Sequence, residues 1–264
     1  SLEKSSHQVK VRVMDASELY DPEFRELIKS KNPTVIIPVG SLEQHGAHLP
    51  ITTDSDIVTE IASRLAKKCG FIVFPTINYG VSYEHDPLTN INIADYNLEK
   101  ILFDIITSLF HMAPGKETRG KVTSKLSYII LNGHHGNAEA LVNLEAKLKD
   151  KYLGKGFPHA PHGRLRVYSY WHFMEHEFDH AGFVETSLML TISDKVKMKK
   201  AKKGLIIENL SKLEQSAAKK LSTKINGFPK VAKNGVWGDP TSATKKDGEK
   251  FLAEIVRNLA KECQ

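Results

Sequence analysis

The chain has 264 residues, of which 41% are hydrophobic and 26% charged; this globular composition fits one domain over residues 1–264, because no linker or repeat divides it. No run of eighteen apolar residues occurs and the first ten residues lack a signal peptide's apolar core, which predicts a cytoplasmic protein that does not enter a membrane. The net charge of +6 would suit a nucleic acid, but much of it lies in residues 116–125 and 195–203 without aromatic side chains to stack on bases, which favours a solvated basic surface.

Strand and helix patterns alternate along the chain. Four short apolar segments rich in β-branched residues have the pattern of strands covered on both faces: residues 34–39, 71–75, 126–132 and 165–170. Helical patterns with one apolar stripe cover residues 54–67, residues 97–110, a segment after Gly136 and a segment from about Asp247. This alternation predicts a three-layer α/β/α fold with a mostly parallel sheet, whose ligands bind beyond the carboxyl ends of the strands. Two polar stretches, residues 113–125 and 154–164, are expected to be excursions without chemistry.

The first expected strand continues directly into a loop with metal-binding side chains. Glu43 and His45 are separated by one residue, so both side chains can point to the same side of an extended backbone. Asp54 starts the next helix and is placed to give one carboxylate oxygen to each of two metal ions. The alternative role for Asp54 is that of a helix N-cap, for which Ser55 competes.

The third expected strand ends in a second loop of the same kind. His134 and His135 lie there between glycines, which let the backbone turn tightly and approach a ligand closely. A single histidine is more often a hydrogen-bonded structural residue than a ligand. Four imidazoles on two strand-end loops, however, indicate a metal site.

A further group of reactive side chains lies at residues 179–187. His180 and Glu185 are five residues apart, which favours a loop position for His180 and a helix that starts near Glu185. The alternative role for Glu185 is a first-turn carboxylate stabilised by the helix dipole.

The expected ligands are imidazoles and carboxylates without thiolates, a set that suits Zn, Mn or Fe(II). Cys69 and Cys263, the two cysteines, lie far apart and indicate neither a disulfide framework nor a cysteine zinc site. Two such metal ions activate water and polarise a carbonyl, while a nearby histidine passes a proton to the departing nitrogen. The residues therefore predict metal-dependent hydrolysis of a C–N bond in a small-molecule amide.

Taken together, these motifs resemble the creatininase (creatinine amidohydrolase) family. The similarity begins at IIPVGSLEQHGAHLP (residues 36–50) and continues in the family's order through residues 78–86, 131–137, 169–171, 180–190 and 235–252. The resemblance implies a three-layer α/β/α domain, two divalent metal ions per chain and hydrolysis of non-peptide amide or formamide bonds. It also implies a homo-oligomer, a hexamer made of dimers.

The resemblance assigns roles residue by residue. Glu43 and His134 match the ligands of one metal ion, and His45 matches a ligand of the second. Asp54 matches the bridge between them, and His180 matches the histidine that acts in proton transfer.

Two departures from creatininase itself concern the second metal ion and the substrate pocket. Creatininase has a glutamate ligand where this chain has Gly136, and Glu185 is the expected replacement, both as a ligand and in catalysis. Trp171 matches a tryptophan that lines the creatinine pocket, but His176 stands where creatininase has its second pocket tryptophan. These differences argue against a pocket specific for creatinine.

The His-His-Gly-Asn form of residues 134–137 resembles other branches of the family. Among them are the formamidopyrimidine deformylase of riboflavin and deazaflavin biosynthesis and the peptidase of mycofactocin maturation. We favour a formamidopyrimidine ribonucleotide deformylase, because a phosphorylated substrate suits the basic surface better than neutral creatinine does. Hydrolysis of creatinine to creatine is the alternative, and a scaffold without its catalyst or a nucleic-acid-binding module are alternatives of another class.

The remaining candidates lie around these ligands. His48 and Asn137 are expected to orient the ligands by hydrogen bonds, with a structural loop histidine as an equal alternative for His48. Contact with the substrate is expected for four aromatic side chains, and a solvated loop is the alternative for the first of them: His85, His135, Trp171 and His176.

Overall fold

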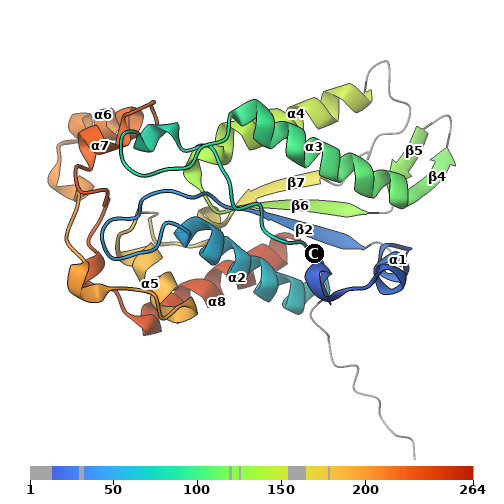
Figure 1. The fold of residues 1–264 in the computed structure, drawn as a ribbon, viewed down its shortest axis with the longest axis horizontal. Helices are drawn as coiled ribbons and strands as arrows, with labels where there is room; N and C mark the ends of the chain where they lie inside the picture. Colours follow the sequence, from blue (N-terminus) through green and yellow to red (C-terminus); the bar gives the residue numbers. More distant parts are fainter. Residues whose placement is uncertain are drawn as a thin grey trace, which may run out of the picture.

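A five-stranded parallel sheet forms the centre of the molecule (Figure 1). The computed structural model describes residues 14–29, 33–118, 121–124, 126–153, 165–177 and 179–263. The strands lie in the order β1 (Met14–Asp15), β3 (Ile72–Val73), β2 (Thr34–Val39), β6 (Ser127–Asn132) and β7 (Leu165–Ser169). All neighbours in this sheet pair in parallel, so the predicted parallel sheet is confirmed.

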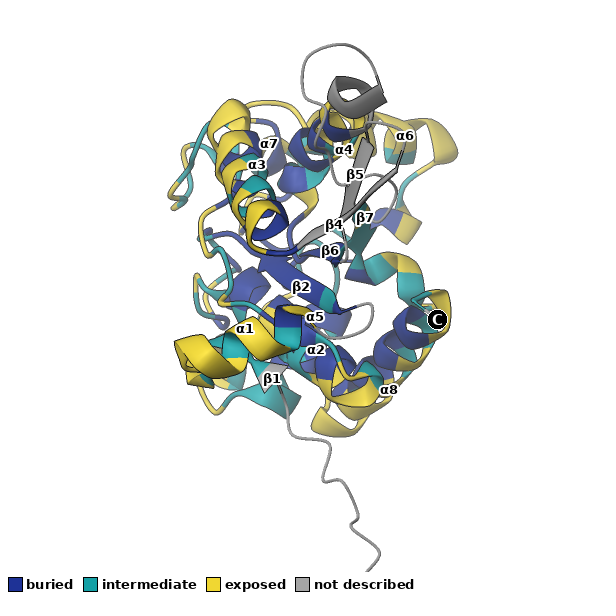
Figure 2. Ribbon diagram, turned by 90° about the vertical axis from the view of Figure 1, so that its right-hand side faces the viewer, coloured by how far each residue is buried: buried dark blue, intermediate teal, exposed yellow. Residues whose placement is uncertain are grey.

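Helices cover both faces of the sheet, which confirms the three-layer prediction (Figures 1 and 2). One face packs against α1 (Asp21–Lys29), α3 (Asp95–Met112) and α4 (Ala138–Leu153). The other face packs against α2 (Thr53–Cys69), α5 (Phe183–Ile192) and α8 (Lys245–Glu262).

The side chains of β2 alternate between the two cores, because successive residues of a strand point to opposite faces. Val35, Ile37 and Val39 are buried in the core under α3 and α4, whereas Ile36 is buried in the core under α2 and α8. Burying each such aliphatic side chain stabilises the fold by about 1.5–3 kcal/mol. The strand is therefore covered on both faces, as its continuous apolar sequence predicts.

Several elements were not expected from the sequence. These are the short strand β1, helix α1, and the pair α6 (Lys212–Ser222) and α7 (Phe228–Val231). The polar stretch 113–125, expected to be an excursion, contains two paired antiparallel strands, β4 (Pro114–Thr118) and β5 (Lys121–Ser124), which form a sheet separate from the central one. The other polar stretch, residues 154–164, lies outside the described residues.

The strand order places two loops next to each other at the carboxyl end of the sheet. The chain passes from β2 to β3 on one side, and β6 then pairs with the other side of β2. The loops that follow β2 and β6 therefore start from neighbouring strands and run in different directions. The crevice between two such loops is where α/β sheets bind their ligands. Helices α6 and α7 lie at this same end (Figure 1). None of the described helices is long and apolar enough to cross a membrane.

Candidate metal centre

The loop after β2 brings Glu43 and His45 into the interior. Both side chains are fully buried, although each is polar. His45 Nδ1 donates to the carbonyl oxygen of Glu43 at 3.1 Å, which leaves Nε2 to face the centre of the site. A neutral histidine held in this way presents a lone pair on Nε2, as a metal ligand must.

Asp54 lies between two imidazoles, at the start of α2. The N-cap position of this helix is Thr52, so Asp54 belongs to the first helical turn and is not the cap. Its Oδ1 lies 3.2 Å from Nε2 of His45, and its Oδ2 lies 3.1 Å from Nδ1 of His134. One oxygen therefore faces each imidazole, the arrangement expected of a bridging carboxylate.

His134 reaches Asp54 because β6 and α2 approach closely at Gly133. A Cβ atom at Gly133 would lie 2.7 Å from the carbonyl oxygen of Asp54, so only glycine fits there. His134 Nε2 donates to the carbonyl oxygen of Val81 at 2.8 Å and lies 3.2 Å from Oε2 of Glu43. The bond to Val81 leaves Nδ1 directed at Asp54.

Glu185 completes the group from the first turn of α5. Its Oε2 accepts the backbone N–H of Ala181 at 2.7 Å and lies 3.4 Å from Nε2 of His45. Asp179 holds this turn by accepting the N–H groups of Val184 at 2.8 Å and Glu185 at 3.3 Å. Glu185 therefore has both arrangements considered from the sequence: it lies in a first helical turn, and it faces a proposed ligand.

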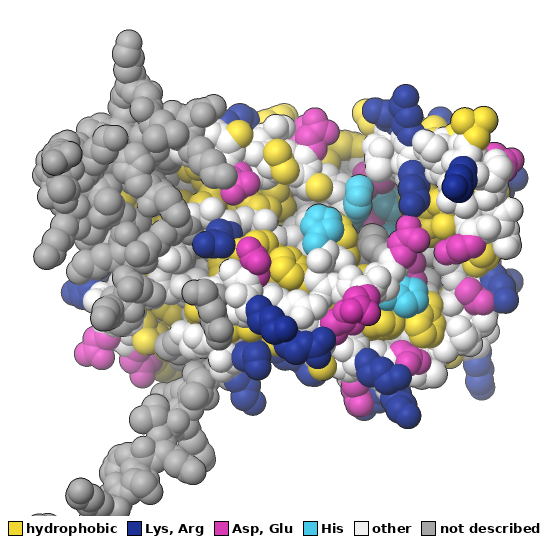
Figure 3. Space-filling model, turned by 180° about the vertical axis from the view of Figure 1, so that it is seen from behind, with side chains coloured by type: hydrophobic (Ala, Val, Ile, Leu, Met, Phe, Trp, Pro, Cys, Tyr) yellow, Lys and Arg dark blue, Asp and Glu magenta, His cyan; other side chains and the backbone are white. Residues whose placement is uncertain are grey.

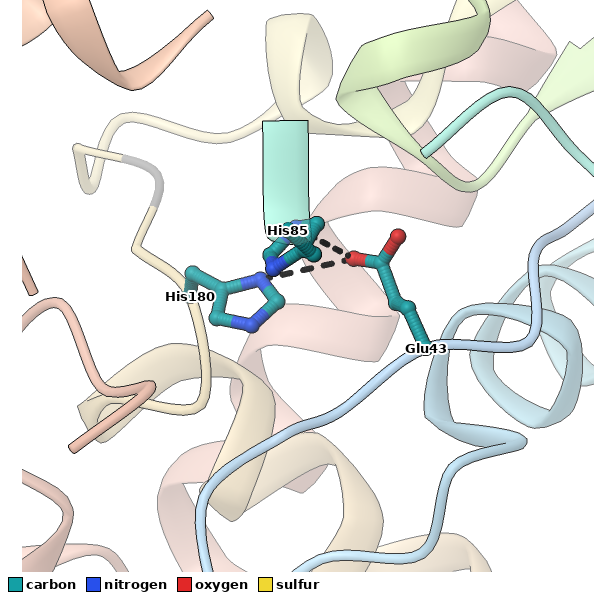
Figure 4. Close-up of side chains that lie close together, drawn as sticks. All are labelled: Glu43, His85 and His180. Carbon is teal, nitrogen blue, oxygen red and sulfur yellow. Dashed lines mark ion pairs between the residues drawn. The ribbon is translucent and has the colours of Figure 1, made fainter. Parts of the chain in front are cut away.

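His180 and His85 lie on the same side of Glu43 (Figure 4), and all three residues line a cavity. His85 Nε2 is 3.0 Å from Oε1 of Glu43, and His180 Nδ1 is 3.8 Å from the same oxygen. The centroids of the two imidazole rings are 4.8 Å apart. His85 is buried and touches Glu43, so the solvated-loop alternative for His85 is wrong.

The buried charges perturb one another strongly. Burial alone would raise the pKa of Glu43, but adjacent imidazoles, His134 foremost, lower this pKa well below its ordinary value. Burial alone would lower the pKa of His45, but the carboxylates of Asp54 and Glu185 raise this pKa to about 10. Burial raises the pKa of Glu185 to about 8, and Asp54 adds to that effect while His45 opposes it. Several carboxylates held together away from water create a field that attracts cations.

Unpartnered polar atoms show that this group of residues fits divalent metal ions. Four buried atoms make no hydrogen bond: Glu43 Oε1, His45 Nε2, Asp54 Oδ2 and Glu185 Oε1. Such atoms are costly unless a partner satisfies them. Ligand atoms of Glu43, His45 and Asp54 lie within 4.8 Å of one another, as do those of His45, His180 and Glu185. Imidazole and carboxylate donors suit Zn, Mn or Fe(II).

A cavity of about 250 Å³ opens above these residues. Figure 3 shows a hollow in this face, with histidine and acidic side chains around it. Its inner wall includes Glu43, Asp54, His85, His134 and His180. Its outer wall comes from α6, α7 and the segment beyond: Lys219, Ser222, Thr223, Phe228 and Trp237. The cavity thus combines a charged base with an aromatic wall and one lysine.

Of the four residues expected to contact the substrate, two line the cavity and two do not. His85 and His135 both line the cavity. Trp171 stacks on His135 with ring centroids 5.9 Å apart and is not among the described residues that line the cavity. His176 is exposed and packs against Phe183 and Phe251, beside a neighbouring cavity.

His48 and Asn137, which were expected to orient the ligands, contact the site indirectly. His48 Nε2 lies 2.9 Å from the hydroxyl of Thr186, the residue after Glu185. Asn137 donates to the carbonyl oxygen of Gly40 at 3.0 Å and accepts the N–H of Val81 at 2.9 Å. Asn137 therefore connects the loops that carry Glu43, His134 and the carbonyl partner of His134.

Sequence reasoning missed three contributors to the site. Glu84 lines the cavity with Oε1 at 3.4 Å from Nε2 of His134. Gln44 touches both His85 and His180. The outer wall comes from α6 and α7, for which the capping-box pattern at Ser211–Glu214 was the available signal.

Comparisons with known proteins agree with this architecture. The family model described as creatininase, creatinine amidohydrolase, matches residues 17–263. The mycofactocin precursor peptide peptidase of Mycolicibacterium smegmatis is 32% identical over 241 residues, covering 88% of this chain and 85% of that protein. The 2-amino-5-formylamino-6-ribosylaminopyrimidin-4(3H)-one 5'-monophosphate deformylase of Methanobrevibacter ruminantium is 32% identical over 152 residues, 52% of this chain and 60% of that protein. The solved structure described as creatininase Mn has the same fold, with a TM-score of 0.72 at 21% identity over 95% of this chain and 97% of that one.

Proposed function

The chain belongs to the creatininase family of enzymes that hydrolyse C–N bonds, and on this premise we propose that five buried residues hold two divalent metal ions for that reaction. The residues are Glu43, His45, Asp54, His134 and Glu185. The observation that supports the proposal is the set of four buried atoms without hydrogen bonds on four of these side chains. Asp54 would contribute one oxygen to each ion, with His45 and Glu185 on one side and Glu43 and His134 on the other.

Metal ions bound there would polarise the scissile carbonyl and lower the pKa of water. A related solved structure is described as containing Mn, and the donor set of this chain suits Mn, Zn or Fe(II) equally. The aromatic and charged walls of the cavity hold the substrate over the carboxylates and limit the access of bulk water.

His180 is the proposed proton carrier. Its Nε2 is held by Gln44 at 3.0 and 3.1 Å, whereas Nδ1 faces the cavity side of Glu43. In hydrolysis, the oxygen of water bonds to the carbonyl carbon, the C–N bond breaks, and the nitrogen leaves with a proton. His180 Nδ1 would take a proton from water and return it to the departing nitrogen, so that a carboxylate and an amine result.

For the substrate, we propose a formamidopyrimidine ribonucleotide, from which hydrolysis releases formate. The rings of Phe228 and Trp237, with centroids 6.5 Å apart, offer a flat apolar wall for a pyrimidine. Lys219, whose ammonium group also pairs with Glu177 at 2.9 Å, would donate to a phosphate from the same wall. Similarity to the archaeal deformylase supports this substrate, although it covers only 52% of the chain.

A peptide amide is the second candidate. Similarity to the mycofactocin precursor peptide peptidase covers 88% of the chain, and this longer match favours an amide flanked by peptide groups. Creatinine receives less support, because Trp171 and His176 are not among the described residues that line the cavity. A scaffold without a catalyst receives the least support, because burying the charges described above is costly and such a scaffold would not require them.

A substrate panel tests these proposals. Purified enzyme, loaded in turn with Zn, Mn and Fe(II), would be assayed for release of formate or amine from a formamidopyrimidine nucleotide, a short peptide and creatinine. Formate release from the nucleotide would support the deformylase. Peptide cleavage or creatinine hydrolysis would replace it with the corresponding alternative, and turnover of none by the metal-loaded enzyme would reject all three substrates.

A further inference from the structure

Gln44 lies between the two histidines that border Glu43 on the cavity side. Its amide nitrogen is 3.0 Å from Nδ1 of His85 and 3.1 Å from Nε2 of His180. It therefore touches His85 on the ring nitrogen opposite to the one that faces Glu43. The role of Gln44 depends on which end of its carboxamide points at the imidazoles.

The neighbouring backbone determines that orientation. The N–H of Gly46 donates to Oε1 of Gln44 at 3.0 Å, so the oxygen end of the amide points toward Gly46. In the flipped orientation, the amide NH₂ would face that N–H, and two donors would oppose each other. Gly235, with φ 73°, packs against the same oxygen: a Cβ atom there would lie 1.8 Å from Oε1. The nitrogen end is thereby left to face His85.

An amide NH₂ group can only donate, so Nδ1 of His85 must accept. The neutral ring that accepts on Nδ1 carries its proton on Nε2, and this nitrogen lies 3.0 Å from Oε1 of Glu43. His85 then presents an N–H group instead of a lone pair to the carboxylate, in a charge contact that does not meet hydrogen-bond geometry and leaves Oε1 without a hydrogen bond. The contact with Gln44 disfavours the other tautomer, in which Nδ1–H would oppose the amide.

This arrangement decides between two roles for His85. By distance alone, Glu43, His85 and His180 form a group of ligand atoms within 4.8 Å that could hold a metal ion. A nitrogen that carries a proton cannot bind a metal. His180 is not constrained in the same way, because its Nε2 contacts both the carbonyl oxygen of Gln44 at 3.0 Å and the amide nitrogen, and these contacts require opposite roles.

We infer that Gln44 is a positioning residue that keeps the proton of His85 on Nε2, so that His85 holds the carboxylate of Glu43 in place and is not itself a metal ligand. This inference rests on the metal centre proposed above. It predicts that Gln44 and His85 act on metal affinity through one shared contact to Glu43. Residues that orient a metal ligand in this way typically change affinity by about 10–100-fold when they are removed.

The tautomer itself is the first readout. In protein with ¹⁵N-labelled histidine, the shifts of the His85 nitrogens, assigned by their loss in His85→Ala, distinguish a protonated from an unprotonated or metal-bound nitrogen. The expected result, in zinc-loaded and metal-free protein alike, is an unprotonated Nδ1 and a protonated Nε2. A protonated Nδ1, or a zinc-bound Nε2, would overturn the inference. The shifts are measured on wild-type protein and His85→Ala serves only to assign them, so the outcome does not depend on the folding of a variant at Gln44.

Metal affinity is the second readout, measured by competition with a chelator. Gln44→Met keeps the size of the side chain and removes its hydrogen bonds. Gln215→Met is the matched control, because the amide of Gln215 donates one hydrogen bond, to Leu210, away from the site. Gln44→Met is expected to weaken zinc binding by about 10–100-fold, with no effect of Gln215→Met.

A double-mutant cycle separates a shared contact from two independent ones. The variant with both Gln44→Met and His85→Ala is expected to bind zinc no more weakly than the weaker single variant. Additive losses, or unchanged affinity in Gln44→Met, would contradict a shared role. If the wild type binds no metal, the proposed metal centre fails, whereas the tautomer of His85 in metal-free protein still tests the role of Gln44.

Discussion

Replacing Asp54 with asparagine tests the bridge between the two proposed metal sites. The substitution keeps the shape of the side chain and removes its negative charge from between His45 Nε2, at 3.2 Å, and His134 Nδ1, at 3.1 Å. Losing an orienting neighbour costs a metal site about 10–100-fold in affinity, so losing a direct ligand should cost each ion at least about 100-fold. That factor equals about 2.7 kcal/mol per ion, or about 5.5 kcal/mol for the pair.

Asp56→Asn is the matched control. Asp56 lies in the same first turn of α2 and accepts the hydroxyl of Thr52 at 2.9 Å, so it has a similar place in the helix dipole but no histidine partner. Either substitution should remove about 0.3–1 kcal/mol of helix-dipole stabilisation. Elemental analysis after dialysis should show loss of both ions in Asp54→Asn alone. Retention of two ions in Asp54→Asn would refute the bridging role.

Four further predictions concern separate parts of the molecule. His180→Ala should keep its metal ions while kcat falls by about 10²–10⁴-fold; normal turnover would exclude His180 as proton carrier. Glu185→Gln should lose one ion per chain by elemental analysis, and unchanged stoichiometry would leave Glu185 only its structural place in α5. Thr244→Ala should lower the free energy of unfolding by about 1 kcal/mol in a urea titration, because Thr244 caps α8 by accepting the N–H of Asp247, and an unchanged midpoint would contradict this. Burial, and secondarily the nearby Cys69, raise the pKa of Cys263 to about 11. The rate at which an alkylating reagent modifies this thiol should therefore rise about tenfold per pH unit between pH 8 and 10, and a plateau below pH 9 would contradict this.

The sheet could be predicted because its central strands β2 and β6 are buried on both faces. Together with the edge strand β7, they fall where their apolar runs predict them, within one residue at each end. The expected strand at residues 71–75 is only Ile72–Val73, because the backbone beyond Val73 leaves the regular pairing with β2. β1 has two residues, too few for any periodic pattern. Organisation as a single domain and assembly into a homo-oligomer stay predictions.

The site could be predicted where ligands directly follow a strand. Glu43, His45 and His134 leave the ends of neighbouring strands, so parallel pairing of β2 with β6 brings them together. His85 and Glu84 come instead from a short 3-10 helix after β3, whose position depends on how residues 78–92 fold over the sheet. That path has no periodic signal in the sequence, and the inner position of His85 could not be anticipated.

The aromatic wall of the cavity could not be predicted from the sequence, for a different reason. Phe228 belongs to a helix of four residues, and Trp237 is held by backbone bonds to His180, almost sixty positions earlier. Contacts between such distant segments follow from tertiary packing and leave no local pattern. The lysine-containing helix α6 follows a capping box at Ser211 and Glu214, so that element was detectable in principle.

The measurement that most directly tests the dinuclear centre is the metal content of the wild-type protein, purified without chelator and analysed by elemental mass spectrometry with protein quantified by amino-acid analysis. The proposed ligand sets on either side of Asp54 predict two divalent ions of Zn, Mn or Fe per chain. One ion per chain would contradict the bridging arrangement. No bound ion, even after incubation with each metal, would contradict the metal centre itself.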